Sequence, residues 1–243
     1  MTNAVIAGYV RSPFHFAGKG DLARVRPDDL AASVVRALIE RTGVKPEDIE
    51  DIILGCAFPE GEQGLNVARL VGLLADLPIS VAGMTVNRFC GSSMQSVHIA
   101  AGQIGLGAGE VFICAGIESM SRVPIMGFNP LINPALQKST PDAYISMGET
   151  AENVARKWQI PRGEQERFAV RSHQRAAAAR DAGKFEAEIV PIVAKSGPVA
   201  QDGCIRPDTS AEGLASLKPA FDKEGSVTAG TSSPLTDGAA AVL

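Results

Sequence analysis

Strand-like and helix-like segments alternate over the first ~120 residues, and this alternation constrains the fold more than any other feature. The runs at 49–58 and 110–117 are short and apolar, whereas apolar residues after Pro27 recur at helical spacing. This pattern predicts an α/β fold with helices covering a parallel-type sheet. Strands are expected at 4–10, 49–58, 81–86 and 110–117, and helices are expected from Pro27, after Asn66 and near Ser92.

The ends of these helices carry recognisable signals. Asp28 and Asp29 lie in the first turn after Pro27, where the helix dipole favours acidic side chains, and Gly43 ends that helix. Asn66 is expected at the N-cap position of the second helix. The apolar stripe of the third helix is expected to consist of Met94, Val97, Ala101 and Ile104.

The composition is that of a globular protein with a core of ordinary size. The 243 residues are 45% hydrophobic and 21% charged, and the net charge of −4 argues against binding to nucleic acid. No apolar run reaches the ~18 residues of a membrane span, and no secretory signal is recognisable. The four cysteines form no C-x-x-C pair, so no metal site is expected, and their scattering indicates a reducing, cytoplasmic setting.

The character of the chain changes after Glu118. The following residues are rich in Pro, Asn and Ser, and two helices and a short strand come next. The chain ends on the apolar run AAAVL, and because compact domains seldom end inside such a run, we expect a truncated chain. The later helices are expected at 150–158 and 163–182, the strand at 189–193, and an irregular polar segment at 196–223.

Cys90 lies where a strand meets a helix. Gly91 and two serines follow it, so Cys90 is expected near the helix N-terminus, where the dipole favours a thiolate. Gly91 would let a substrate carbonyl approach, and the Cys90 N–H could stabilise an oxyanion. The alternative from these residues alone is a small buried cysteine at a tight turn, which suits Cys56 and Cys114 better.

The segment VNRFCGSSMQ at 86–95 resembles the acyl-enzyme motif of thiolases. Further segments match motifs of that family in the same order along the whole chain. The form RFC at 88–90, together with GCAFPE at 55–60, is closer to degradative 3-ketoacyl-CoA thiolases, of the β-oxidation type, than to biosynthetic acetoacetyl-CoA thiolases. The further segments are GIESMS at 116–121, MGETAENVA at 147–155, EIVP at 188–191, TAGTSS at 228–233 and DGAAA at 237–241.

The resemblance implies a thiolase-like layered α/β fold, a mixed sheet covered by helices, without the second core domain of the family. Residues 1–120 and 224–243 would form the N-terminal core domain, and residues 121–223 would form an inserted, mostly helical loop domain on the CoA-binding side. Cys90 would be the acyl-thioester nucleophile. Ser233 would contact pantetheine, Met147 the acyl group and Arg206 the nucleotide end of CoA.

The resemblance also implies acyl-CoA and CoA as substrates, no tightly bound cofactor, no membrane partner and a homodimer or homotetramer. Relatives often have a histidine before the matching methionine, but this chain has Ser146 there. The activating histidine and the second catalytic cysteine belong to the second core domain of thiolases, and their motifs are absent from this sequence. We therefore expect the 243-residue chain to be inactive alone.

None of the three histidines is a convincing base for Cys90. His98 is eight residues further along the same helix, which is ~12 Å away, and it is expected to be partly buried. His173 is expected on a solvated helix face, and nothing in the sequence orients His15. Without a partner histidine, an unrelated cysteine hydrolase is disfavoured. A thiolase, or a non-catalytic CoA-binding or dimerisation module, remains.

Two other patterns favour ordinary structural roles. Arg167, Arg171 and Arg175 are four residues apart and line one helical face, which is expected to be solvated rather than bound to CoA phosphates. The glycines at 105, 107 and 109 follow a helix rather than a strand. We therefore interpret them as a helix-to-strand turn and not as a nucleotide loop.

Overall fold

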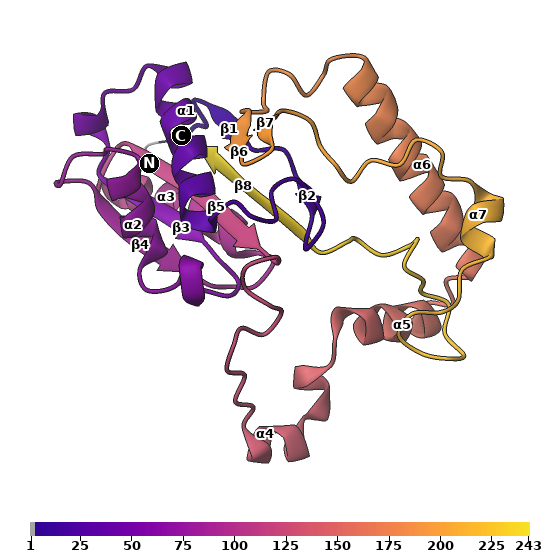
Figure 1. Ribbon diagram of the computed structural model, residues 1–243. Helices are drawn as coiled ribbons and strands as arrows, with labels where there is room; N and C mark the ends of the chain where they lie inside the picture. Colours follow the sequence, from indigo (N-terminus) through magenta and orange to yellow (C-terminus); the bar gives the residue numbers. More distant parts are fainter. Residues whose placement is uncertain (1–2) are drawn as a thin grey trace. The chain divides into compact units, whose positions relative to one another are not determined.

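The computed structural model describes residues 3–243, which fall into two compact units (Figure 1). The first unit comprises Met1–Asn129, Glu186–Cys204 and Leu235–Leu243, and the second comprises Pro130–Phe185 and Ile205–Pro234. The second unit thus begins nine residues later than the expected loop domain at 121–223, and extends past its expected end. Residues 186–204 lie in the first unit because their hydrogen bonds are made with β1 and the loop after it.

The first unit is built on a mixed sheet of six strands. The strands β3 (Asp51–Gly55), β4 (Ala82–Val86) and β5 (Phe112–Ser119) are mutually parallel, as the alternating pattern predicts. The strand β8 (Thr236–Val242) pairs antiparallel with β5 and with β1 (Tyr9–Arg11), giving the order β1-β8-β5-β3-β4. The strand β2 (His15–Phe16) also pairs with β8. The apolar run at the end of the sequence is therefore an interior strand of the sheet.

Helices cover the two faces of this sheet. The helices α1 (Pro27–Thr42) and α2 (Val67–Leu74) contact each other and the sheet, and the larger core contains Ile52 and Leu54. Between these two residues Ile53 belongs to a separate cluster with Ala100 of α3 (Ser92–Leu106). Because successive side chains of a strand point to opposite faces, α3 covers the face opposite to α1 and α2.

Two helix ends lie where the sequence predicts them. Gly43 (φ 66°) ends α1, and Asn66 is the N-cap residue of α2. The Asn66 side chain does not cap the helix itself: it donates to Gly83 O (2.8 Å) and accepts from the Thr85 hydroxyl (2.9 Å), so it joins α2 to β4.

The predicted stripe of α3 is buried only in part. Val97 and Ile104 pack against the second core cluster, whereas Met94 is 59% exposed. The fully buried residues of α3 are the small Ser92, Ser96 and Ala100.

An ion-pair network holds residues 186–204 within the first unit. The Arg11 guanidinium contacts Glu188 (2.7 Å) and makes two bonds to Asp202 (2.7 and 2.8 Å). Burial alone would raise the pKa of Asp202, but the bonds from Arg11 and the Phe14 N–H outweigh it and leave that pKa below its usual value. Between these contacts the chain forms a hairpin of β6 (Ile192–Ala194) and β7 (Gly197–Val199).

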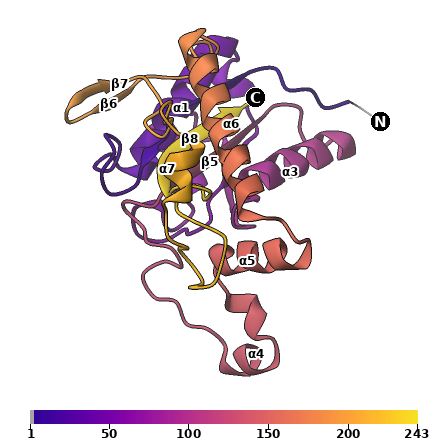
Figure 2. The ribbon, with the colours of Figure 1, turned by 90° about the vertical axis from the view of Figure 1, so that its right-hand side faces the viewer.

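The second unit is mostly helical, as expected (Figure 2). Its longest helices, α5 and α6, begin three and one residues before the predicted positions. Ser146 and Glu149 form a capping box at the start of α5. The buried Glu152 of α5 accepts from Ser226 N (3.0 Å) and Val227 N (2.8 Å), which fixes the segment that leads to Ser233. The helices of the second unit are α4 (Pro134–Ser139), α5 (Met147–Lys157), α6 (Arg162–Asp181) and α7 (Ala211–Ala215), with a short 3-10 turn at Pro141–Tyr144. The first unit has 3-10 turns at Pro46–Asp48 and Gly61–Gln63.

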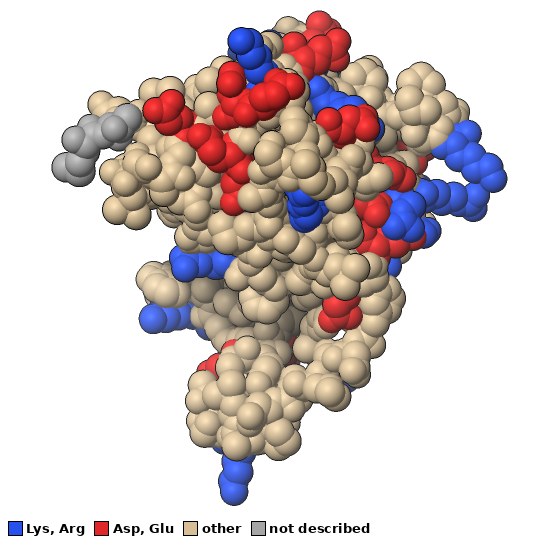
Figure 3. Space-filling view, turned by 90° about the vertical axis from the view of Figure 1, so that its left-hand side faces the viewer, with Lys and Arg blue, Asp and Glu red and all other residues tan. Residues whose placement is uncertain are grey.

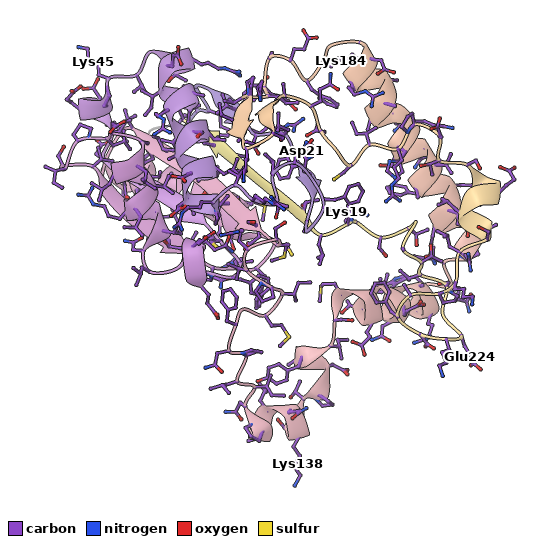
Figure 4. The ribbon with its side chains drawn as sticks, in the orientation of Figure 1. Lys19, Asp21, Lys45, Lys138, Lys184 and Glu224 are labelled. Atoms are coloured by element: carbon purple, nitrogen blue, oxygen red, sulfur yellow. The ribbon has the colours of Figure 1, made fainter. Side chains whose placement is uncertain are left out.

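Charged side chains of both signs are interspersed on the face shown in Figure 3. Figure 4 shows the Lys138 side chain projecting from α4 and Lys19 on the loop after β2. Across residues 3–243 no helix combines the length and the apolarity that crossing a membrane requires.

Candidate active site

Cys90 lies on the turn between β4 and α3, one residue before the N-cap residue Gly91. Its side chain is exposed. Ser92 fixes the turn, because its hydroxyl accepts from Arg88 N (2.8 Å) and donates to Phe89 O (2.5 Å). Asn87 adds two bonds, from its amide to Ala57 O (2.9 Å) and from Phe89 N to its carbonyl oxygen (2.8 Å). The thiol is thus presented by a turn with little freedom.

Glycines of the sheet allow α3 to begin close to the strands. A Cβ atom on Gly55 of β3 would lie 2.4 Å from Ser93 N and 2.5 Å from Ser92 C. A Cβ atom on Gly116 of β5 would lie 1.9 Å from the Ser93 hydroxyl oxygen. Real Cβ atoms do not approach backbone atoms as closely as at Gly55, so that position requires glycine, while a side chain at Gly116 would displace the Ser93 side chain. The two glycines therefore set the depth at which the Cys90 turn lies on the sheet.

The strained residue of the turn is Phe89 and not Gly91. Phe89 has φ +46°, a left-handed conformation that is costly for a residue with a Cβ atom. Gly91 has φ −90°, and a Cβ atom there would make only ordinary contacts of at least 3.5 Å. The chain itself therefore does not require glycine at 91. The Phe89 ring contacts Phe58, with centroids 6.0 Å apart.

Cys90 differs from the other three cysteines in its surroundings. Burial raises the pKa of the Cys56 thiol to about 12, and the Glu118 carboxylate adds to this shift. Burial likewise raises the pKa of the Cys114 thiol to about 11. The Cys204 thiol donates to Phe14 O (3.7 Å). Cys90 alone combines exposure with a place at the start of a helix, which is where a nucleophilic thiolate is favoured.

No histidine of the described residues is hydrogen-bonded to the Cys90 thiol. Both ring nitrogens of the buried His15 are engaged, one with Gln201 O (2.8 Å) and the other with the Asp21 N–H (3.2 Å). His98 is exposed on α3 and not partly buried as predicted. His173 belongs to the second unit, where its Nδ1 accepts a backbone N–H.

Glu118 and Gln63 form a buried polar network that the sequence reasoning missed. The Glu118 carboxylate accepts from Ala57 N (2.7 Å) and from the Gln63 amide (2.5 Å). Gln63 also donates to Phe58 O (2.9 Å) and accepts from Ser119 N (3.1 Å). Burial raises the pKa of Glu118. Because Ala57 O also receives the Asn87 amide, this network connects β5 to the Cys90 turn.

Asp237 is a fully buried carboxylate without a predicted role. It accepts from the Ser119 hydroxyl (2.9 Å) and from Ser121 N (2.9 Å), and it thereby joins β8 to the end of β5. Glu118 and Asp237 both lie in segments that the motif comparison had singled out, at 116–121 and 237–241. The motifs could have located these carboxylates, but only the folded chain shows what they bind.

The other three predicted site residues all lie in the second unit. Met147, at the start of α5, is 69% exposed and lines an open groove of about 1210 Å³ between α5 and α6. Arg206 lines a separate hollow of about 470 Å³. Ser233 is exposed and follows Thr231, which lines the groove.

The groove is apolar with cationic residues at its edge. Arg171 lies over the ring of Phe168, 5.4 Å from its centroid, and both line the groove together with Arg167. The arginine row is solvated as predicted, since Arg167 and Arg171 are exposed and Arg167 pairs with Glu164 (3.9 Å), but these residues also border the concave apolar surface. Such a groove suits a long, mostly apolar ligand that has an anionic part. No group of three or more metal-ligating side chains is found in the described chain.

Comparisons with known proteins agree with this fold. Residues 4–243 match the family model of the thiolase N-terminal domain. The whole chain is 48% identical to the 3-ketoacyl-CoA thiolase of Bacillus subtilis (strain 168) and covers 66% of that protein. It is 44% identical to the 3-ketoacyl-CoA thiolase of Idiomarina loihiensis, with 100% of this chain and 64% of that protein covered.

A solved structure gives the same result for the fold. The crystal structure of the Bacillus anthracis acetyl-CoA acetyltransferase is 40% identical and superposes with a TM-score of 0.86. The match covers 100% of this chain and 65% of that one. This chain thus spans just under two thirds of the length of these relatives.

Proposed function

The chain belongs to the thiolase family, and we propose that it carries the acyl-transfer nucleophile and part of the CoA-binding surface of a 3-ketoacyl-CoA thiolase. The observation that carries the proposal is the exposed Cys90 at the start of α3, on a turn fixed by Asn87 and Ser92. The two relatives from Bacillus subtilis and Idiomarina loihiensis are named 3-ketoacyl-CoA thiolases, which favours the degradative reaction, whereas the structural relative is named an acetyl-CoA acetyltransferase.

The proposed reaction has two steps. The Cys90 thiolate attacks the 3-keto carbon of a 3-ketoacyl-CoA, the bond between C2 and C3 breaks, and the acyl group stays on sulfur as a thioester. The leaving carbanion takes a proton and departs as acetyl-CoA. The thiol of a free CoA then attacks the acyl thioester, which releases a shortened acyl-CoA and restores Cys90. CoA is a substrate here, and the chemistry needs no tightly bound cofactor.

The groove of the second unit supports the binding part of the proposal. Its apolar lining with Met147 suits an acyl-pantetheine chain, and Arg167 and Arg171 at its edge suit phosphate oxygens. Ser233 follows the wall residue Thr231 and would contact the pantetheine, while Arg206 would contact the nucleotide end. A cytoplasmic homodimer or homotetramer remains our expectation for the complete protein.

The two protons that these steps transfer need a base and an acid. The exposed thiol of Cys90 has no histidine partner in the described part of the chain, and His15 is committed to other hydrogen bonds. We propose that residues outside this sequence supply the acid–base groups, as the resemblance to thiolases implies. The same observation favours the second candidate function, a thiolase fragment that binds CoA or dimerises without turnover. A biosynthetic acetoacetyl-CoA thiolase would use the same cysteine in reverse.

The test separates acylation from turnover. The chain is incubated with acetoacetyl-CoA, and the acyl group is located by peptide mass spectrometry, with Cys90→Ser and Cys204→Ser as paired variants. We expect acylation of Cys90 that the Cys204→Ser variant retains, and no cleavage with free CoA. Acylation at another residue, or none at all, would count against the nucleophile. Turnover that Cys90→Ser abolishes would show that this chain needs no further acid–base group.

A further inference from the structure

The segment 205–217 carries Arg206 and α7 and lies along α6. The C-terminal end of this segment is bonded to the first residue of α6, Arg162. The Arg162 guanidinium donates to three backbone carbonyls there, Leu214 O (3.1 Å), Ala215 O (3.2 Å) and Leu217 O (2.7 Å). Glu166, one turn along α6, holds Arg162 in place (2.6 Å). A guanidinium stays charged at every physiological pH, so this attachment does not titrate.

A single imidazole fastens the other end of the segment. The Nδ1 atom of His173 on α6 accepts the backbone N–H of Arg206 (3.2 Å). This bond requires Nδ1 without a proton, because a protonated imidazole has only donors. On the far side of Arg206 its carbonyl accepts from Thr209 N (3.2 Å) and from the Thr209 hydroxyl (2.8 Å). The position of this loop relative to α6 therefore depends on the protonation state of His173.

The fastened segment forms its own hollow of about 470 Å³. Residues from Ile205 to Ser210 line it together with Gly213 and Leu214. At one side the Ser210 hydroxyl accepts from Gly213 N (3.1 Å), which keeps the loop and α7 in register. A shift of the Arg206 backbone changes the shape of this hollow, since Arg206 is one of its walls.

We propose that neutral His173 is a positioning residue for CoA: it holds the Arg206 loop in the shape that receives the anionic nucleotide end of the ligand. The inference rests on the proposed function, because it takes CoA as the ligand of this segment. His173 does not itself touch the ligand. It acts through the backbone of Arg206, whose guanidinium is suited to phosphate.

The charges around His173 fix the direction of the pH dependence. Burial and the nearby Arg206 cation both lower the pKa of His173 below its ordinary value of 6.5. The facing loop also carries Asp208, and α6 itself carries Arg171 and Arg175 on either side of the histidine. The ring is therefore neutral and the bond intact above pH 6.5, and the bond is lost as the pH falls through the lowered pKa.

The experiment measures CoA binding to the 243-residue chain by calorimetry between about pH 8 and pH 5, where histidine changes charge. His173→Asn keeps an acceptor at the position of Nδ1 but cannot be protonated, and His173→Ala removes the acceptor. His98→Ala, on an exposed position of α3, is the matched control. CoA phosphate groups themselves titrate near pH 6. The pH dependence that remains in His173→Asn therefore measures the contribution of the ligand.

We expect wild-type affinity to fall about fivefold more than that of His173→Asn on acidification, as one lost hydrogen bond predicts. His173→Ala should bind about fivefold more weakly already at pH 8, and His98→Ala should match the wild type. The Arg206 amide resonance, followed by NMR without CoA, should titrate in the wild type and not in His173→Asn.

Two results would overturn the inference, and they can be told apart from failure of the proposed function. Equal pH dependence in wild type and His173→Asn, or wild-type affinity in His173→Ala, refutes the positioning role while CoA binding itself stands. If no variant binds CoA, the proposed function of this surface fails, and the ligand assigned to the Arg206 loop fails with it, even where the Arg206 amide still titrates with His173.

Discussion

The close approach of α3 to the sheet makes Gly55→Ala a sensitive perturbation. The added Cβ atom would lie 2.4 Å from Ser93 N and 2.5 Å from Ser92 C, whereas ordinary carbon contacts need about 3.5 Å. The start of α3 must therefore move by about 1 Å, and overpacking of this kind costs about 1–3 kcal/mol. Replacing a glycine in a strand returns about 0.5 kcal/mol through backbone entropy. We expect a net loss of about 2 kcal/mol.

Thermal unfolding followed by circular dichroism measures this loss. For a chain of this size about 2 kcal/mol corresponds to a midpoint lower by about 4–8 °C. Because the displaced helix carries the Cys90 turn, the rate of Cys90 alkylation in the folded protein should also change. The matched control is Gly72→Ala in α2, whose Cβ atom would have its nearest neighbours at 3.6 and 3.7 Å.

The control should move in the opposite direction. Alanine is about 0.5–1 kcal/mol better than glycine inside a helix, so Gly72→Ala should raise the midpoint by about 1–4 °C. A Gly55→Ala protein as stable as the wild type, with unchanged Cys90 reactivity, would refute the argument that this glycine sets the depth of the turn. Loss of stability in both variants would point to a general intolerance of substitution instead.

Two further predictions concern thiol reactivity and acid stability. Brief iodoacetamide treatment should label Cys90 before Cys56 and Cys114, because the latter are buried with their pKa values raised to about 12 and about 11; peptide mapping that shows equal rates would contradict this. Arg11→Met should lower stability by about 2 kcal/mol at neutral pH, since it leaves the half-buried Asp202 carboxylate without its partner. In the wild type the contribution of Asp202 is present above pH 3.8 and lost as the pH falls through its lowered pKa, so the difference between the thermal midpoints of wild type and variant should shrink on acidification.

Each of these predictions has a control within the chain. Cys204→Ser should leave the labelling rate of Cys90 unchanged, because the Cys204 thiol contacts Phe14 O elsewhere in the first unit. Arg180→Met removes an exposed pair with Asp181 (2.8 Å) and should change the midpoint little, as surface ion pairs contribute less than about 1 kcal/mol. If Arg180→Met lowered the thermal midpoint as much as Arg11→Met does, burial would not explain the stability loss of Arg11→Met.

The periodicity of apolar residues located the helices and strands correctly, but it was less reliable about which side of a helix is buried. The strands β3, β4 and β5 and the helices α1, α2 and α3 lie where alternation predicts them. The apolar stripe predicted for α3 holds for Val97 and Ile104 and fails for Met94, because the start of the helix is placed by closeness to the sheet and not by hydrophobicity. The small Ser92 and Ser93 lie against Gly55, and Ser93 also lies against Gly116, a match between two distant segments that no single periodic pattern contains.

The part of the candidate site that lies within one sequence motif could be predicted from the sequence. The part that depends on contacts between distant residues could not. The motif around Cys90 located the turn. The left-handed residue of that turn is Phe89, whereas the sequence alone would suggest Gly91 for a left-handed conformation. The partners of Glu118 are 55 to 62 residues away in sequence, and those of Asp237 are 116 and 118 residues away. Such pairs become visible only when the chain is folded.

The place of β8 in the sheet has a consequence for the order of folding. Residues 236–242 must insert between β5 and β1, although the Ser119–Asp237 bond joins residues 118 positions apart. Until that long loop closes, the edge of β5 that will receive β8 has no strand on it and β1 has no partner in the sheet. The sheet of the first unit thus combines β1, near the start of this sequence, with β8, which is synthesised after the second unit. Until β8 is in place, the open edge of the sheet must be protected against pairing with strands of other chains.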